Sequence, residues 1–170
     1  MARMQLPADG VPRRLDPRVI PFGRLVGRIT AVLVSIGLLV SLVIGGLASE
    51  APRWLWLAGG ASWILVTAWL ARWAHRWPGL SYQYSSYLVN DRGIEIRDGV
   101  YWRKVIAVPR SRVQHIDVSQ GPVQRAYGLA TLTIFTAGTA YSSVPLSGLA
   151  HETALALRDA LLPKRTDDGV

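Results

Sequence analysis

The sequence contains no cysteine, which excludes disulfide bonds, thiol catalysis and cysteine-bound metals. It has three histidines, at widely separated positions: His75, His115 and His151. Common catalytic patterns are also missing, because there is no GxSxG elbow, no GxxxxGK phosphate loop and no HExxH motif. We therefore expect neither enzymatic activity nor a cofactor.

Charged residues are scarce but strongly unbalanced. They make up 18% of the chain, against 50% for apolar residues, and 19 Lys and Arg face 11 Asp and Glu. The resulting net charge of +8 suits an anionic lipid surface or a nucleic acid, and the placement of the basic residues must decide between the two.

Two long runs in the first half carry no charge. Residues 29–48 and 54–71 would form helices of about 30 and 27 Å, close to the thickness of a bilayer core. The alternative is a pair of buried helices in a soluble protein. Only SEAPR separates the runs, so they predict a transmembrane hairpin within residues 25–77. Tryptophan, typical of membrane interfaces, flanks the second run: Trp54, Trp56, Trp69, Trp73 and Trp77.

Small residues recur every four positions in both runs. Gly37, Ser41 and Gly45 do so in the first, and Ala58 and Ser62 in the second. This spacing lets helices approach closely. It predicts packing between the two helices of one chain, with a dimerisation face as the alternative.

Basic residues lie before the first span and after the second, whereas the turn between the spans has only Arg53, beside Glu50. The positive-inside rule then places both termini of a two-span, multi-pass protein in the cytoplasm. A signal peptide is the alternative, but the apolar run starts late and a second span follows. The flanking residues are Arg13, Arg14, Arg18, Arg24, Arg28, Arg72 and Arg76.

The second half changes to short segments separated by turn signals. Ile94 and Ile96 alternate with polar residues, which is the pattern of a half-buried strand. The segment 147–162 reads as an amphipathic helix with Ser147 as its N-cap. Strands are expected at 82–89, 94–97, 100–108, 113–119, around 131–134 and at 141–146. A short helical turn or a loop is expected at 109–112, a loop at 120–128 and a turn from Gly138.

Several strands followed by one helix favour a strongly bent sheet with the helix at one end. The predicted fold class is α+β with a membrane anchor: a two-helix transmembrane hairpin, then a pleckstrin-homology-like (PH-like) bent β-sheet or open barrel closed by a C-terminal helix. The expected divisions are a basic cytoplasmic segment at 1–24, the hairpin at 25–77, the PH-like domain at 79–162 and a flexible tail at 163–170.

The stretch VPRSRVQHIDVSQGPVQRAYGLATLTIFTAG, preceded by two spans, resembles bacterial pleckstrin-homology domain membrane proteins of the YdbS-like type. The resemblance covers about residues 25–162. It implies a cytoplasmic PH-like domain without known enzymatic activity, and a partner that is a larger membrane protein with repeated PH-like domains. It implies no agreed ligand. The matching features are Pro109, Arg112-Val113-Gln114, Gln120-Gly121-Pro122, Arg125, Gly128-Leu129-Ala130 and Thr136-Ala137-Gly138.

His115 and Asp117 are the strongest candidates for chemistry. They lie two positions apart on a predicted strand, so their side chains share a face. A metal site needs at least a third ligand, which only folding could supply, from His151. We favour a polar outer face, because Ile116 and Val118 alternate with these residues and face the core.

The loop after this strand is the favoured partner-binding surface, since long loops often carry function. Its candidate residues are Gln120, Gln124, Arg125 and Tyr127. With exposed strand edges, they would make the chain a scaffold or accessory subunit of a membrane complex.

The alternative is a sensor of anionic lipid. Its basic residues lie around one predicted hairpin and beside the second span, where cations attract lipid headgroups. Nucleic acid is disfavoured because this charge lies next to the bilayer. The candidate lipid contacts are Arg72, Arg76, Arg97, Arg103, Lys104 and Arg112.

Overall fold

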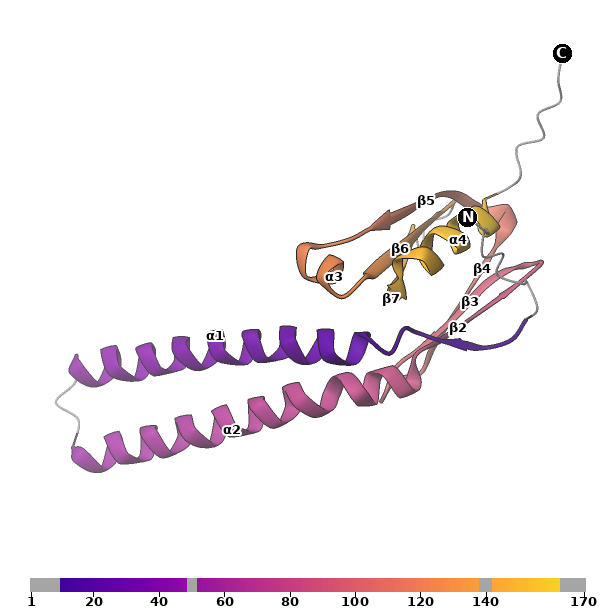
Figure 1. The fold of residues 1–170 in the computed structure, drawn as a ribbon. Helices are drawn as coiled ribbons and strands as arrows, with labels where there is room; N and C mark the ends of the chain where they lie inside the picture. The colour runs from indigo at the N-terminus through magenta and orange to yellow at the C-terminus, as the bar shows by residue number, and fades with distance from the viewer. Residues whose placement is uncertain (1–9, 49–51, 138–141, 163–170) are drawn as a thin grey trace, which may run out of the picture. The chain divides into compact units, whose positions relative to one another are not determined.

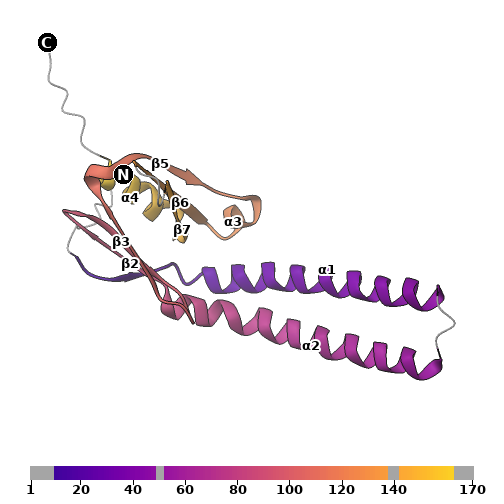
Figure 2. The same cartoon turned by 180° about the vertical axis from the view of Figure 1, so that it is seen from behind.

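The computed structural model describes residues 10–48, 52–137 and 142–162. The chain forms two compact units (Figures 1 and 2). Ile20–Gly79 is a helical hairpin, and Met1–Val19 together with Leu80–Val170 is a β-rich unit. The expected turn at Gly138, the first residue of the strand expected from Tyr141 and the tail from Pro163 lie outside the described residues.

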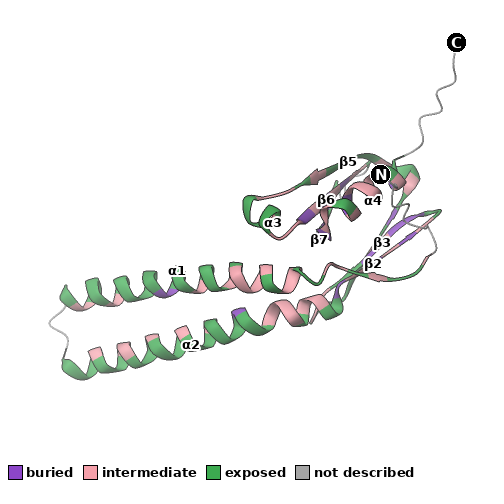
Figure 3. Ribbon diagram, viewed as in Figure 1, coloured by how far each residue is buried: buried purple, intermediate pink, exposed green. Residues whose placement is uncertain are grey.

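The hairpin consists of α1 (Val19–Leu47) and α2 (Arg53–Tyr84), which run antiparallel. Each contains a segment long and apolar enough to cross a membrane. In the most apolar window, 6% of α1 and none of α2 is buried, and Figure 3 shows both helices largely exposed. Helices of a soluble core would be mostly buried, so this exposure favours lipid as their surroundings.

Two hydrogen bonds join α1 and α2 within their uncharged segments. The hydroxyl groups of Ser35 and Thr67 lie 3.0 Å apart and share a hydrogen bond. The indole N–H of Trp63 donates to the Ser35 carbonyl at 3.0 Å. Each bond satisfies a polar group that would otherwise be costly in lipid.

The small residues at the helix contact are not the predicted ones. A side chain at Gly37 or Gly45 would meet no described atom within 4 Å, and Ser41, Ala58 and Ser62 are exposed. The prediction that these five residues pack the pair is therefore wrong. The close approaches occur at Gly23 against Pro78, Gly27 against Ala74, Gly46 against Trp56 and Gly59 against Leu42.

Helix α2 continues past Pro78 and Gly79 to Tyr84, which corrects the expected strand from Tyr82. A side chain at Gly23 would come within 2.8 Å of the Pro78 ring, so a glycine opposite makes room for this proline. Ser85 follows the helix, and its hydroxyl donates to the Ser81 carbonyl at 2.8 Å.

The first sheet is antiparallel, in the order β1-β2-β3-β4. In the turn between β2 and β3, the Asn90 side chain accepts hydrogen bonds from the N–H groups of Arg92 and Gly93. Gly93 has a φ of 153°, which favours glycine. The strands are β1 (Arg13–Arg14), β2 (Ser86–Asn90), β3 (Gly93–Asp98) and β4 (Lys104–Pro109).

Strand β4 begins at Lys104 and not at the expected Val100. Gly99 adopts a φ of 123°, and its backbone lies against the carbonyl of Trp102. This close approach closes a loop at residues 99–103, so the aromatic residues of the loop do not join the strand.

The second sheet is antiparallel, in the order β5-β6-β7. A short 3-10 helix at Arg110–Arg112 leads into it, where a helical turn or a loop was expected. The loop expected at 120–128 contains a short helix, α3, which starts at Pro122, a residue suited to a first helical turn. The elements are β5 (Val113–Ser119), α3 (Pro122–Ala126), β6 (Leu129–Thr136), β7 (Ser143–Ala150) and α4 (His151–Leu161).

Helix α4 starts at His151, so Ser147 is not its N-cap. Ser147 lies in β7 opposite Thr131, whose hydroxyl donates to the Ser147 hydroxyl at 3.1 Å. Strand β7 thus continues to Ala150, four residues further than predicted.

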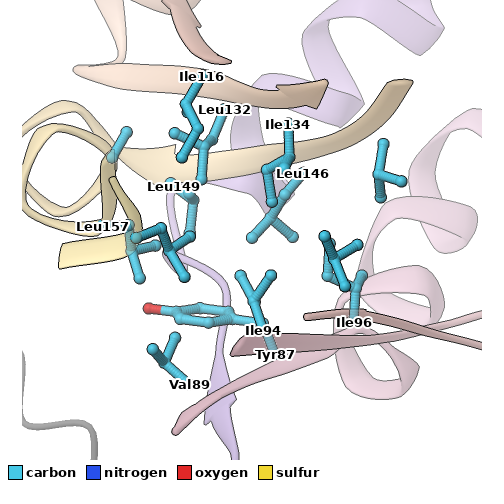
Figure 4. Packing of buried hydrophobic residues seen from close by; sticks show 14 of the residues in the cluster. Tyr87, Val89, Ile94, Ile96, Ile116, Leu132, Ile134, Leu146, Leu149 and Leu157 are labelled. Carbon is cyan, nitrogen blue, oxygen red and sulfur yellow. The ribbon is translucent and has the colours of Figure 1, made fainter. Parts of the chain in front are cut away.

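The core lies between the two sheets and α4, which leaves an open arrangement and not a closed barrel. Figure 4 shows Tyr87 and Ile94 from the first sheet facing Leu146 and Leu149 from the second. The fold class predicted from the sequence is therefore confirmed. The buried cluster is Tyr87, Val89, Ile94, Ile96, Val108, Ile116, Ala130, Leu132, Ile134, Val144, Leu146, Leu149, Ala154, Leu157 and Leu161.

The segment before α1 crosses both sheets. Arg13 and Arg14 pair with β2, and the Asp16 N–H donates to the Gly148 carbonyl of β7 at 3.0 Å. The sequence indicated only a basic segment here. The residues that precede the hairpin and those that follow it therefore belong to one unit.

Candidate interaction surface

The predicted partner-binding loop lies at the end of the β5–β6 hairpin, where α3 connects the two strands (Figure 1). Gln120 donates from its side chain to the Leu129 carbonyl at 2.7 Å. The Gln124 side chain accepts from the Gly121 N–H at 2.9 Å and donates to the Thr131 hydroxyl at 3.1 Å. Both glutamines therefore hold the loop in shape.

The remaining candidate residues of the loop are placed differently from the glutamines. Arg125 is exposed on α3, next to exposed Val123 and Ala126, whereas Tyr127 is half-buried. The structure thus brings all four predicted residues into one short segment. Arg125 and its apolar neighbours form an exposed part of this segment.

The strand before α3 is an edge of its sheet. Strand β5 pairs with β6 in the described residues, and Gln114, His115, Asp117 and Ser119 are exposed along it. An edge strand presents backbone N–H and C=O groups to which a further strand can add. We call β5 and α3 together, residues 113–126, the β5–α3 surface.

The HID stretch lies on this surface. Ile116 is buried and His115 and Asp117 are exposed, as the alternation predicted. The His115 ring stacks on Phe135, with ring centroids 4.1 Å apart. His151 begins α4 and is half-buried. In the part of the chain that the structure describes, no three His, Asp or Glu residues form a group that could hold a metal.

The predicted lipid contacts in the β-rich unit lie at two ends of the first sheet. Asp98 pairs with Lys104, and Arg97 and Arg103 are at this same end. Arg112 follows the other end, beyond Pro109, about 20 Å away along β4. Arg97 also forms an ion pair with Glu95 at 2.7 Å. Arg72 and Arg76 are exposed on α2.

Sequence reasoning missed the exposed aromatic residues of the β3–β4 loop. Tyr101 and Trp102 were expected inside a strand, whereas 80% and 90% of their surfaces are exposed. The available signal was the Asp98-Gly99 turn followed by Val100-Tyr101-Trp102, three residues without polar alternation.

Comparison with known proteins agrees with the fold. A family model described as "Bacterial PH domain" matches residues 19–165, most of the chain. The chain belongs to this family. It is similar to the UPF0699 transmembrane protein YdbS of Bacillus subtilis (strain 168), with 33% identity over 161 residues that cover 90% of this chain and 96% of that protein. No solved structure matches significantly.

The resemblance seen in the sequence is thus confirmed, and so is the membrane character of the chain. The two exposed apolar helices are its candidate spans, and a transmembrane relative matches over almost the whole length. The chain is an integral membrane protein that carries a bacterial PH domain.

Proposed function

We propose that this protein is a membrane-anchored interaction module that docks a second membrane protein on the β5–α3 surface. The observation that carries the proposal is an edge strand that leads directly into an exposed helix. Exposed Arg125 and Val123 offer one charged and one apolar contact. The side chains of Gln120 and Gln124 form hydrogen bonds within the loop and hold α3 in place. A preformed surface of this kind binds without a large ordering cost.

The other edge of the same sheet is less suited to strand addition. Strand β7 contains Pro145, which lacks a backbone N–H, and its register with β6 shifts between Ala130 and Thr131. Proline and irregular register are features that block edge pairing. Strand β5 has its irregularity near Val113 and is regular from His115 to Ser119. It is therefore the better acceptor.

The domain faces the cytoplasm of a bacterial plasma membrane in this proposal. Arg24 and Arg28 precede the apolar part of α1, and Arg72 and Arg76 follow that of α2. Basic residues on these flanks favour the cytoplasmic side. The test uses a cysteine-free protein with one added cysteine, Asp91→Cys. A membrane-impermeant maleimide should label it only after cells are opened, and labelling of intact cells would reverse the orientation.

The partner is expected to be a larger membrane protein with repeated PH-like domains. The experiment places a photo-crosslinking amino acid at Asp117 or Arg125, and at Asp159 on α4 as an exposed control. The same membrane-protein adduct should form from the first two positions and not from the third. Arg125→Glu should abolish the adduct from Asp117. If no adduct forms, or if it forms equally from all three positions, the β5–α3 surface is not the docking site.

The anionic-lipid sensor is less well supported as a single headgroup site. Its residues would have to act together, but β4 separates Arg112 from Arg103 and Lys104, and Arg97 already pairs with Glu95. We therefore propose protein docking as the function of the domain.

A further inference from the structure

The β3–β4 loop presents two large aromatic side chains to solvent. Trp102 is 90% exposed, more than Trp54 and Trp69 of α2, which are 64% and 63% exposed. Tyr101 beside it is 80% exposed. Aromatic side chains of this size contribute most when they are buried. Two adjacent exposed ones therefore indicate a surface that something covers.

The residues that follow identify the chemistry of that surface. Arg103 and Lys104 are exposed and come directly after Trp102. Tyrosine and tryptophan prefer the membrane interface, where their rings sit among the headgroups, and adjacent cations attract lipid phosphate.

The loop projects from the end of the sheet at which the chain leaves α2. Ser86, the first residue of β2, pairs with Arg97, and the loop begins beyond the next residue, Asp98. The Ser85 hydroxyl bridges this end to the last turn of α2, because it contacts both Asp98 and the Ser81 carbonyl. The loop is thus held next to Ser85, the residue that follows α2.

We propose that residues 99–104 form an interfacial anchor that rests on the bilayer holding the hairpin. Tyr101 and Trp102 lie among the lipid headgroups, and Arg103 and Lys104 contact lipid phosphate. The β3–β4 hairpin positions all four side chains together. This role goes beyond partner docking, because it sets which face of the domain is turned to the membrane whether or not a partner is bound.

The absence of cysteine allows a direct test in the full chain. Val105→Cys places a fluorescent label beside the loop at a position that is 60% exposed and keeps residues 99–104 intact. Asp91→Cys, in the turn at the other end of the same strands, is the matched control. Each protein is reconstituted in phosphatidylcholine vesicles with about 30% phosphatidylglycerol and lipid-borne quencher near the headgroups.

The label at position 105 should be quenched about threefold more than the label at position 91, as expected for a site at the interface. In the Val105→Cys protein, Tyr101→Ser with Trp102→Ser should remove the difference, and Tyr101→Phe with Trp102→Phe should retain most of it. Arg103→Gln with Lys104→Gln should reduce quenching in these vesicles and change it little in pure phosphatidylcholine.

Three results would overturn the proposal. Equal quenching at positions 105 and 91 would place the loop away from lipid. Quenching that is unchanged in the double serine variant would show that Tyr101 and Trp102 do not contribute to the membrane contact. Protection of position 105 from both lipid-borne and aqueous quenchers would show a protein contact, such as a second copy of the chain. Circular dichroism and elution volume confirm that each variant is folded before it is compared.

Discussion

The Ser85 hydroxyl donates a hydrogen bond to the carboxylate of Asp98 at 2.6 Å, and so connects the end of α2 to the end of β3. Ser85 is buried, whereas Asp98 is exposed. Ser85 also contacts the Ser81 carbonyl at 2.8 Å. A single hydroxyl hydrogen thus has two acceptors on two different elements.

Removing this contact should loosen the β3–β4 loop without unfolding the domain. Asp98→Ala should cost about 1 kcal/mol, because one hydrogen bond to a charged but exposed group is lost while Ser85 retains Ser81 as an acceptor. Hydrogen–deuterium exchange should rise in residues 99–103, and Asp98→Asn should have a smaller effect. Asp91→Ala, in the opposite turn, is the control, and an equal rise there would contradict the specific role of Asp98.

Much of the β-domain could be predicted because its signals are local. The alternation of Ile94 and Ile96 with polar residues reports one buried face, and the same holds for Ile116 and His115 in β5. Such patterns depend on the period of a strand and need no knowledge of the partner strand. The turn from Asn90 to Gly93 is equally local, since its hydrogen bonds lie within four residues.

The features that were missed depend on residues far away in the chain. Arg13 and Arg14 form a strand only because β2 lies beside them, and two arginines carry no strand signal of their own. Helix α2 passes Pro78 because Gly23, on the other helix, leaves room for its ring. The exposed Tyr101 and Trp102 were missed for a related reason. Strand propensity does not show which residues a turn leaves outside the strand.

Gly148 should be sensitive to substitution because Val19, the first residue of α1, packs against it. Its φ is 84° and an added methyl group would come within 2.5 Å of Val19. Gly148→Ala should destabilise the β-rich unit by about 2–4 kcal/mol, the sum of backbone strain and a clash. Thermal unfolding in detergent measures the loss.

Gly128 offers the matched control for this substitution. Its φ is 66°, but an added methyl group would meet only the end of the flexible Arg18 side chain, at 3.1 Å. Gly128→Ala should therefore cost about 1 kcal/mol, from strain alone. Equal losses for the two variants would show that contact with Val19 contributes nothing.

The contact between Gly23 and Pro78 predicts a selective effect in the hairpin. Gly23→Ala would bring a methyl group within 2.8 Å of the proline ring, and overpacking of this kind costs about 1–3 kcal/mol. The variant should let the helices separate, which limited proteolysis of the detergent-solubilised protein can detect. Gly37→Ala, which meets no described atom within 4 Å, should not increase cleavage. If both variants behave alike, the close approach at Gly23 does not hold the helix pair together.

Tyr87 gives the β-rich unit a predictable dependence on alkaline pH. Burial raises the pKa of Tyr87 above its ordinary value of 10.0, and the charge of Arg13 partly counteracts the rise. The folded state therefore holds the phenolic proton more tightly than the unfolded state does. This contribution to stability is fully present below pH 10 and is lost as the pH rises from 10 through the pKa of the folded state.

Tyr87→Phe isolates that contribution, since phenylalanine fills most of the same space and does not titrate. The unfolding midpoint of the unmodified protein should fall more than that of Tyr87→Phe between about pH 8 and pH 11. Other groups titrate in both proteins and cancel in the comparison. Parallel decreases would mean that Tyr87 loses its proton as readily in the folded unit as in the unfolded chain, which would contradict its burial against the core.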